Sequence, residues 1–213
     1  MKVFVVATIS LLLVAGPAVG PAAGTTVTEP DLAAIRAASE RYRDVSVALA
    51  DGYVAAQACE TAVHMGLPAS TGGMGVHYFR PELLGVDSPP GARVSGHGLH
   101  LDFLHPSILI YEPQADGSME LVAVENLVFE AAWRAAGHDV PPSLHGRRWD
   151  HMADDPATAA DEAHGFAPHY DQHLWLYRDN PAGTYAPFNP SVSCRHYAGG
   201  GATGAGHGAH AGH

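Results

Sequence analysis

Apolar residues recur at helical spacing between Asp31 and Asp51. They are Leu32, Ile35, Tyr42, Val45 and Leu49, whereas Arg36, Glu40, Arg41, Arg43 and Asp44 fall largely on other faces. Thr28, with Asp31 three positions later, and Pro30 in the first turn are typical of a helix start, and an Asp-Gly pair closes the pattern. The pattern predicts an amphipathic helix, and we expect a shorter helix to continue from it to Cys59.

Short runs rich in β-branched and aromatic residues predict four strands later in the chain. They are VHYF after the glycine-rich stretch 70–75, SILIY (107–111), MELVAVENLVF (119–129) and HYDQHLWLYR (169–178). The turn sequence PQADGS separates the second run from the third, so we expect these two to form a hairpin. Two long Pro- and Gly-rich stretches, 85–106 and 135–168, lie between strands, and loops of such length are usually functional or mobile.

These elements predict an α+β fold in a single domain. We expect the N-terminal helix to pack on a mainly antiparallel β-sheet or open β-barrel of hairpin-linked strands. A doubly wound parallel sheet is disfavoured because few helical patterns separate the strands. The hydrophobic fraction of 46% in 213 residues suffices for one packed core, which we place at residues 25–198.

The N-terminus differs from this domain in composition. Lys2 is followed by an apolar run from Val3 to Val14 and then by small and turn-forming residues up to Gly24, which is typical of a secretory signal peptide. The run is too short for a stable membrane-spanning helix, and no later apolar run reaches about 18 residues. We therefore expect residues 1–24 to be removed and the mature chain to be secreted or periplasmic, without a transmembrane segment.

The C-terminal tail, 199–213, consists mainly of Gly, Ala and His and has no bulky apolar side chain. We expect this tail to be disordered. His207, His210 and His213 recur in it at a spacing of three. Because neutral imidazole suits Cu(II), Ni(II) and Zn(II), such a tract can capture these ions loosely without any fold.

Charge and missing motifs narrow the function classes. The chain has 22 Asp+Glu and 11 Lys+Arg, which gives a formal net charge of −11. Because proteins bind the phosphate backbone of nucleic acids through positive charge, we expect no nucleic-acid partner. The chain has 15 His. It contains no GxSxG, Walker A loop, dinucleotide GxGxxG in a βαβ frame or HExxH. These absences remove the easily recognised hydrolase, nucleotide-binding and zincin classes.

Cys59 and Cys194 are the only two cysteines. An even count in an exported chain favours a disulfide, and neither has a second cysteine nearby that would make a thiolate metal site. The alternative is a catalytic thiol, since His196 follows Cys194 closely, although closeness in sequence does not make a dyad. We expect the disulfide, which closes a loop long enough for roughly 4 to 5 kcal/mol of stabilisation in the chain-entropy model.

Five segments carry a specific sequence pattern. They are GGMGVHYF (72–79), ILIYEP (108–113), LVAVEN (121–126), HYDQHLWLY (169–177) and NPAGTYAPFNPSVSC (180–194). They resemble a family of exported, mostly bacterial proteins of uncharacterised function, whose segments look like GGMGxHY, ALLYEP, LVGVEY, HYxxHxWL and NPxGxxAxFNPxVSC. The chain departs from this family at Ser107, where Glu is usual, at Asn126, where Tyr is usual, and in the stretch 135–164. The resemblance implies an exported domain and no established activity.

Strand alternation places histidines and carboxylates on apolar faces, because residues two apart share a face. Glu125 shares its face with Leu121, Ala123, Leu127 and Phe129, and His77 shares its face with Phe79. In the last strand the shared face holds His169, Asp171, His173, Trp175 and Tyr177. A desolvated carboxylate or imidazole needs a partner such as a metal ion. We therefore expect His77, Glu125 and His173 to converge on one divalent transition metal, Zn, Cu, Mn or Fe.

His169 and Asp171 have secondary places in this hypothesis. On an uninterrupted strand His169 and His173 lie about 13 Å apart at about 3.3 Å per residue, too far to share an ion with bonds of ~2.1 Å. His169 would join only if the chain bends near Tyr170. Asp171 is expected to accept a hydrogen bond from an imidazole and orient it. Glu112, at the end of its strand, is a weaker candidate.

The competing interpretation is that His77 and His173 are core histidines with ordinary hydrogen bonds and that Glu125 pairs with an arginine. A rival site is the segment HGLHLDFLH, which contains His97, His100 and His105. Its HxxH spacing suits a helical turn, but the flanking Pro and Gly favour a loop. Four further histidines in the second long stretch are expected at the surface: His138, His145, His151 and His164.

Two function hypotheses remain open from the sequence. The first is an exported metal-binding protein, and a metalloenzyme if a coordination position is open. The second is a non-catalytic secreted protein that binds a small ligand or has a structural role, with no metal in the folded domain.

Overall fold

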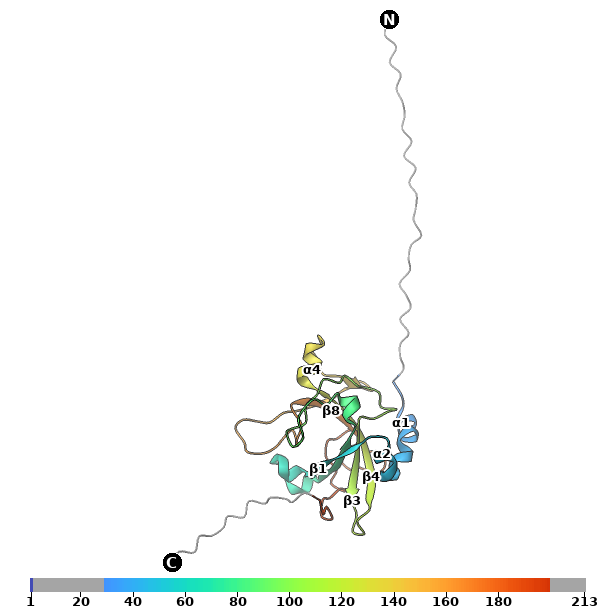
Figure 1. Cartoon of the computed structure of the whole chain (residues 1–213), viewed down its shortest axis with the longest axis vertical. Coiled ribbons are helices and arrows are strands. Elements are labelled where there is room, and N and C mark those ends of the chain that lie inside the picture. The colour runs from blue at the N-terminus through green and yellow to red at the C-terminus, as the bar shows by residue number, and fades with distance from the viewer. Residues whose placement is uncertain (2–28, 200–213) are drawn as a thin grey trace, which may run out of the picture.

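The computed structural model describes Met1 and residues 29–199 of the chain (Figure 1). The predicted signal peptide (1–24) and the tail histidines His207, His210 and His213 lie outside the described residues. Within the described part, no helix is both long enough and apolar enough to cross a membrane.

A curled antiparallel sheet of six strands forms the centre of the fold (Figure 1). In spatial order its strands are β1 (Val54–Thr61), β2 (Gly73–Phe79), β3 (Ile108–Pro113), β4 (Met119–Phe129), β8 (His169–Leu174) and β7 (Asp150–Met152). Each strand pairs antiparallel with its neighbours. The predicted hairpin is confirmed as β3 and β4, and the predicted α+β class with a single domain is confirmed as well.

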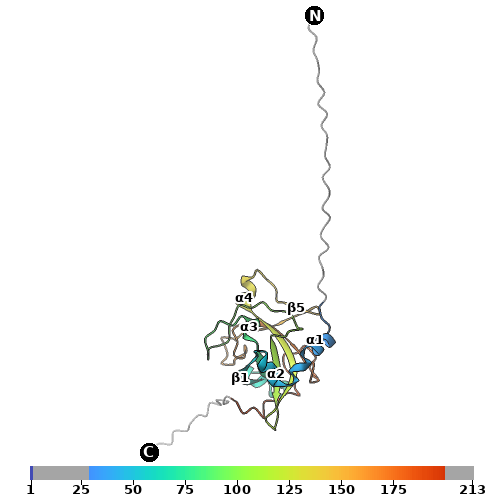
Figure 2. The same cartoon turned by 45° about the vertical axis from the view of Figure 1, so that its right-hand side comes forward.

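Two short helices, α1 (Leu32–Ser39) and α2 (Val45–Ala50), pack against one face of the sheet and are joined by the 3-10 turn Glu40–Arg43 (Figure 2). The predicted single helix is therefore interrupted. Asp44 is extended, and its carboxylate accepts a backbone N–H two residues later, so that it caps α2 as Asp31 caps α1. An aspartate at this position competes with the helix interior and favours a new helix start.

The segment after α2 is the strand β1, so the prediction that a helix continues to Cys59 is wrong. Gly52, with φ of 93°, ends the helical region, and the following residues pair with β2. Alanine-rich sequence favours a helix locally, but cross-strand pairing overrides that preference. The disulfide between Cys59 and Cys194 is confirmed, with Cα atoms 5.7 Å apart. It joins this edge strand to the C-terminal part of the described chain.

The two faces of the sheet carry different cores. Toward α1 and α2 lie Val76, Tyr78, Leu109, Tyr111, Val124 and Leu174. On the opposite face lie Phe79, Ile108, Ile110, Ala123, Leu127 and Phe129. Leu121 belongs to the helix-side core, so the prediction that it shares a face with Glu125 is wrong. The register slips between Ala123 and Leu121, where β4 has one extra residue relative to β3.

The two long stretches between strands contribute to both cores: Phe103, Leu144 and Trp149 belong to the helix-side core, whereas Val86, Val94 and Phe166 lie on the face opposite the helices. The first, 85–106, has no helix or strand, whereas 135–168 contains the edge strand β7 and the small hairpin of β5 (Ser143–Leu144) and β6 (Arg147–Arg148). A parallel bridge between Val94 and Phe166 joins the two stretches over the face opposite the helices. The last strand ends at Leu174, earlier than predicted. The remaining short helical elements are Ala62–Met65, Ala69–Thr71, α3 (Pro81–Leu84) and α4 (Glu130–Ala135).

Candidate metal centre

Three strands bring His77, Glu125 and His173 together on the face opposite the helices. Glu125 and His173 are direct partners across β4 and β8. His77 is on β2, two strands away from β4, so the backbones are about 10 Å apart at about 4.8 Å per strand. The curl of the sheet closes this gap, and the three fully buried side chains meet over β3.

The distances within this first group (His77, Glu125 and His173) suit a single ion. Oε2 of Glu125 lies 3.2 Å from Nε2 of His77 and 3.5 Å from Nε2 of His173. One ligand atom from each residue lies within 4.8 Å of the other two. Around a tetrahedral ion with bonds of about 2.1 Å, neighbouring ligand atoms are about 3.4 Å apart. The first group could therefore hold a metal ion without rearrangement of the backbone.

A second group (His164, His169 and Asp171) lies beside the first, and its ligand atoms also lie within 4.8 Å of one another. Because β8 is unbroken, His169 does not join the first group, in agreement with the distance argument. Its Nε2 is 3.6 Å from Oδ2 of Asp171. The same carboxylate oxygen is 3.8 Å from Nδ1 of His173 and so connects the two groups. The six residues together are called the buried cluster below.

The prediction that His164 lies at the surface is wrong. It is 3% exposed, and its ring centroid is 5.1 Å from those of both His77 and His169. It belongs to an irregular segment and has φ of 41°, a left-handed conformation uncommon for residues other than glycine. Irregular backbone has no periodicity that reveals where a side chain points. The only sequence hint is the pair of apolar neighbours Ala163 and Phe166, which are also buried.

Every side-chain nitrogen and oxygen of the buried cluster, with one exception, lacks a hydrogen-bond partner within the protein. The exception is Nδ1 of His169, which is 2.9 Å from the carbonyl oxygen of Ala167. The contacts of Glu125 with His77 and His173 are short, but they are not aligned as hydrogen bonds. The polar atoms therefore approach one another without pairing, which is unusual for buried groups.

Burial favours the neutral form of several cluster residues. Desolvation lowers the pKa of His77 to about 4, although the charges of Glu60 and Asp171 act in the opposite direction. Desolvation also places the pKa of His164 well below its ordinary value, and the neighbouring histidines add to this effect. The pKa of Glu125 is raised to about 7 by desolvation, against the lowering effect of His173. Since neutral imidazole is the form that binds metals, His77 and His164 are ready to bind at neutral pH.

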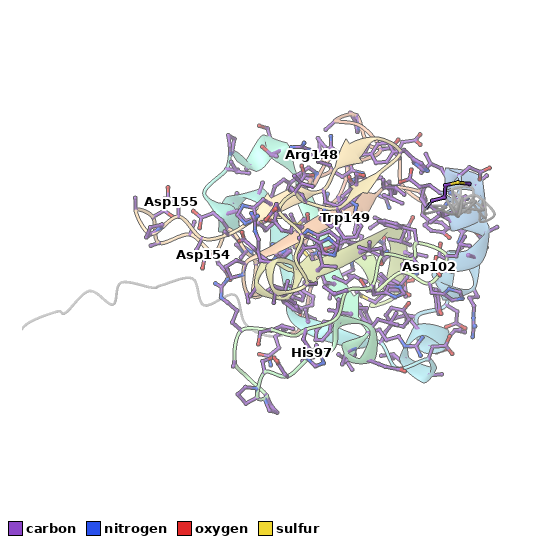
Figure 3. All side chains as sticks on the ribbon, turned by 90° about the horizontal axis from the view of Figure 1, so that it is seen from above. His97, Asp102, Arg148, Trp149, Asp154 and Asp155 are labelled. Carbon is purple, nitrogen blue, oxygen red and sulfur yellow. A yellow bond between two sulfur atoms is a disulfide. The ribbon has the colours of Figure 1, made fainter. Side chains whose placement is uncertain are left out.

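A cavity and aromatic side chains border the cluster. Trp175 stacks on His173 with ring centroids 6.1 Å apart. The cavity, of about 510 Å³, is lined mainly by Ala, Val, Pro and Phe side chains together with Glu60, Arg93 and His164. Arg93 is held by Asp154 and Asp161, and Figure 3 shows Asp154 on a loop that projects from the body of the domain. Of the six cluster residues, only His164 lines this cavity.

The histidines of the rival segment HGLHLDFLH do not belong to the buried cluster. The side chains of His97 and His105 are 78% and 73% exposed, and His97 lies on an outer loop (Figure 3). Nε2 of His100 is 2.7 Å from the carbonyl oxygen of His105. Glu112, the weaker candidate, pairs with Arg178 at 2.9 Å. The other histidines predicted at the surface are exposed: His138, His145 and His151.

The competing interpretation of the cluster does not fit the geometry. Core histidines are normally hydrogen-bonded, but both ring nitrogens of His77 and of His173 lack partners. The ion-pair contacts of Glu125 within the described chain are with these histidines and not with an arginine.

Comparison of the chain with protein families, curated proteins and solved structures finds no match. The functional argument therefore rests on the chemistry of the buried cluster.

Proposed function

We propose that this chain is an exported protein that binds a divalent transition-metal ion through His77, Glu125 and His173. The set of buried polar atoms without partners carries the proposal. Each unpaired buried group costs about 1–3 kcal/mol, whereas a whole domain is stable by only about 5–15 kcal/mol. A cation at the centre of the first group would satisfy three of these groups at once.

The donor set defines the class of metal. Two imidazoles and one carboxylate suit Zn, Cu, Mn or Fe. Oδ2 of Asp171 is 3.8 Å from Nδ1 of His173 and forms no hydrogen bond with it; a shortening of this contact on metal binding would orient that ring, as carboxylates behind metal-bound histidines do. Three protein ligands leave a position for water or another ligand, an arrangement that serves hydrolysis, oxygen chemistry and storage alike.

Export is the second part of the proposal. The disulfide between Cys59 and Cys194 fits an oxidising compartment, and the N-terminal sequence has the composition of a signal peptide. We place the mature protein outside the cytoplasm, secreted or periplasmic.

A second candidate function is supported by the cavity. Its volume of about 510 Å³ and largely apolar lining are typical of a small-ligand site. In that case the folded domain would carry no metal, and protons and ordered water would satisfy the cluster. Protons and water can satisfy single buried groups, but they do not explain why two sets of imidazole and carboxylate atoms converge within 4.8 Å of one another, which is why metal binding is the better supported function.

Elemental analysis of the exported protein tests the proposal. The full mature chain would carry His207→Ala, His210→Ala and His213→Ala, so that the tail cannot contribute metal. This tail variant is purified without chelators or a histidine tag. We expect it to contain stoichiometric transition metal, and we expect Glu125→Gln in the same background to lose the ion of the first group.

The matched control is His105→Ala, which removes an exposed imidazole from the rival segment and should leave the metal content unchanged. Near-UV circular dichroism verifies that each variant is folded. A folded tail variant that contains no metal and takes up none from added Zn(II), Cu(II), Mn(II) or Fe(II) would reject metal binding in favour of the second candidate function.

A further inference from the structure

The second group has the features of a metal site in its own right. Its three residues come from β8 and from the irregular segment before it. His169 and Asp171 are fully buried, and His164 nearly so. A metal ion bound only by the first group would leave both ring nitrogens of His164 and Nε2 of His169 without a protein hydrogen-bond partner.

The backbone selects the tautomer of the neutral His169 ring. Its Nδ1 is 2.9 Å from the carbonyl oxygen of Ala167, and a carbonyl can only accept, so Nδ1 carries the hydrogen. In the neutral ring Nε2 then bears a lone pair. This nitrogen is 3.6 Å from Oδ2 of Asp171, so two acceptors face each other. A cation between them turns that repulsion into attraction, and a backbone-anchored Nδ1 is usual for metal-binding histidines.

His164 is held toward the same place at a conformational cost. Its left-handed backbone is of the kind that persists only where the surrounding structure enforces it. Two backbone hydrogen bonds with Val94 hold this conformation. The carbonyl of Val94 accepts from the N–H of Ala167 at 2.8 Å, and the N–H of Val94 donates to the carbonyl of Gly165 at 2.9 Å. The hydrogen bonds between the stretches 85–106 and 135–168 thus hold the side chain of His164 inside the cluster. Both of its ring nitrogens lack a protein partner there.

We propose that His164, His169 and Asp171 bind a second divalent transition-metal ion, so that the buried cluster is a two-metal centre. The second ion goes beyond the proposed function, which needs only the first. Asp171 lies between the two positions, because its Oδ2 faces His169 on one side and His173 on the other.

Charge balance indicates what else the second ion binds. Two divalent cations bring four positive charges, whereas Glu125 and Asp171 supply two negative ones. Among the charged residues that line the cavity, Arg93 is paired with Asp154 and Asp161, so Glu60, 8% exposed, remains to compensate part of the excess positive charge. Because uncompensated buried charge is costly, the second ion should take a hydroxide or small anion from the cavity. His164 is the cluster residue that lines this cavity, so the second ion is the accessible one.

Metal stoichiometry in the tail variant tests the second site. The metal-free protein is loaded with excess Co(II), desalted, and measured by native mass spectrometry and elemental analysis. We expect two ions per chain in the tail variant and one in each of His164→Gln, His169→Gln and His77→Gln. His138→Ala, which removes an exposed histidine, is the matched control and should retain two.

Azide, a small anion, identifies which ion is accessible. It should change the visible Co(II) spectrum of the tail variant and of His77→Gln, which keeps the second ion. It should leave the spectrum of His164→Gln unchanged. Agreement between the His164→Gln and His169→Gln variants guards against a folding defect in either one.

The proposal is overturned if the tail variant binds one ion and His164→Gln and His169→Gln still bind one, although the proposed function would then survive. It is also overturned if both variants keep two ions. A tail variant that binds no ion would reject both proposals.

Discussion

Glu125 is a fully buried carboxylate whose nearest polar neighbours are two imidazoles. Its pKa is raised from 4.5 to about 7, first by desolvation. The folded protein therefore holds this proton more tightly than the unfolded chain does. The associated stability is fully present below pH 4.5 and is lost as pH rises through 7. Without metal, the ionised carboxylate is a destabilising group at alkaline pH.

Replacing Glu125 with Gln should stabilise the metal-free protein although it removes a proposed metal ligand. In metal-free protein at pH 8, Glu125→Gln should raise the free energy of unfolding by on the order of 1–3 kcal/mol, because Gln cannot ionise. Near pH 4.5 the difference should vanish. Urea unfolding after chelation measures both values. Glu82→Gln, whose side chain is 78% exposed, should show no such difference, and equal stability of wild type and Glu125→Gln at pH 8 would contradict the assigned burial cost.

The buried histidines have the opposite pH dependence. The pKa of His77 is lowered to about 4 by desolvation, so between pH 4 and 6.5 the unfolded chain binds more protons than the folded one. Stability from this group is present above pH 6.5 and lost as pH falls toward 4. The metal-free wild type should therefore lose stability in acid relative to His77→Gln, by up to about 1.4 kcal/mol per pH unit. Urea unfolding of both proteins from pH 4 to 8 measures this difference, and a constant difference would show that His77 is not desolvated.

Strand periodicity predicted the faces of five of the six cluster residues and could not predict His164, the fourth histidine. His77, Glu125 and His173 follow from alternation, because a strand fixes which side each residue faces. His164 lies in irregular backbone, where direction depends on contacts made by Val94, about 70 residues earlier in the chain. Asp171 was predicted on the right face, but its position between two groups depends on His164 and so was not visible from the sequence.

At the scale of elements, the disulfide joins β1 at the edge of the sheet to the segment that follows the last strand. The bridged cysteines are 135 residues apart. A loop of this length corresponds to roughly 4 to 5 kcal/mol in the chain-entropy model. Reduction should lower the free energy of unfolding by about that amount, as measured by urea unfolding with and without reductant.

The double variant Cys59→Ser with Cys194→Ser is the control for this effect. Its stability should match the reduced wild type and should not respond to reductant. Its metal content should be unchanged under native conditions, since neither cysteine belongs to the buried cluster. Equal stability of the oxidised and reduced wild type would contradict a stabilising role for the bond.

The elements differ in how far local sequence determines them. The hairpin of β3 and β4 was predictable because its turn and both strand patterns are contiguous. β1 was not, because an alanine-rich segment has no local strand signal, and its conformation depends on pairing with β2. The helical stretch between Asp31 and Asp51 was predicted, but its break was not. In the sequence Asp44 does not differ from other polar positions on a helix, and its role is visible only in the structure, where its carboxylate caps α2.

At the scale of the whole molecule, the proposed metal binding would be coupled to folding. The buried cluster draws on β2, β4, β8 and the segment 161–168, so its ligand atoms come together only in the folded protein. The tail histidines are near one another in sequence and are expected to bind metal equally in the folded and unfolded chain. Only ions that prefer the folded state stabilise it.

This difference allows the number of cluster ions to be counted from stability alone. Well above the dissociation constant, each ion specific to the folded state should add about 1.4 kcal/mol to the free energy of unfolding for every tenfold increase in free metal. Two ions should therefore give a slope of about 2.7 kcal/mol per decade in the wild type, measured by urea unfolding in buffered Zn(II). The tail variant should show the same slope, because its missing histidines do not distinguish the folded from the unfolded chain. His164→Gln should halve the slope by removing one ion, whereas a slope near zero in the wild type would mean that folding creates no metal site.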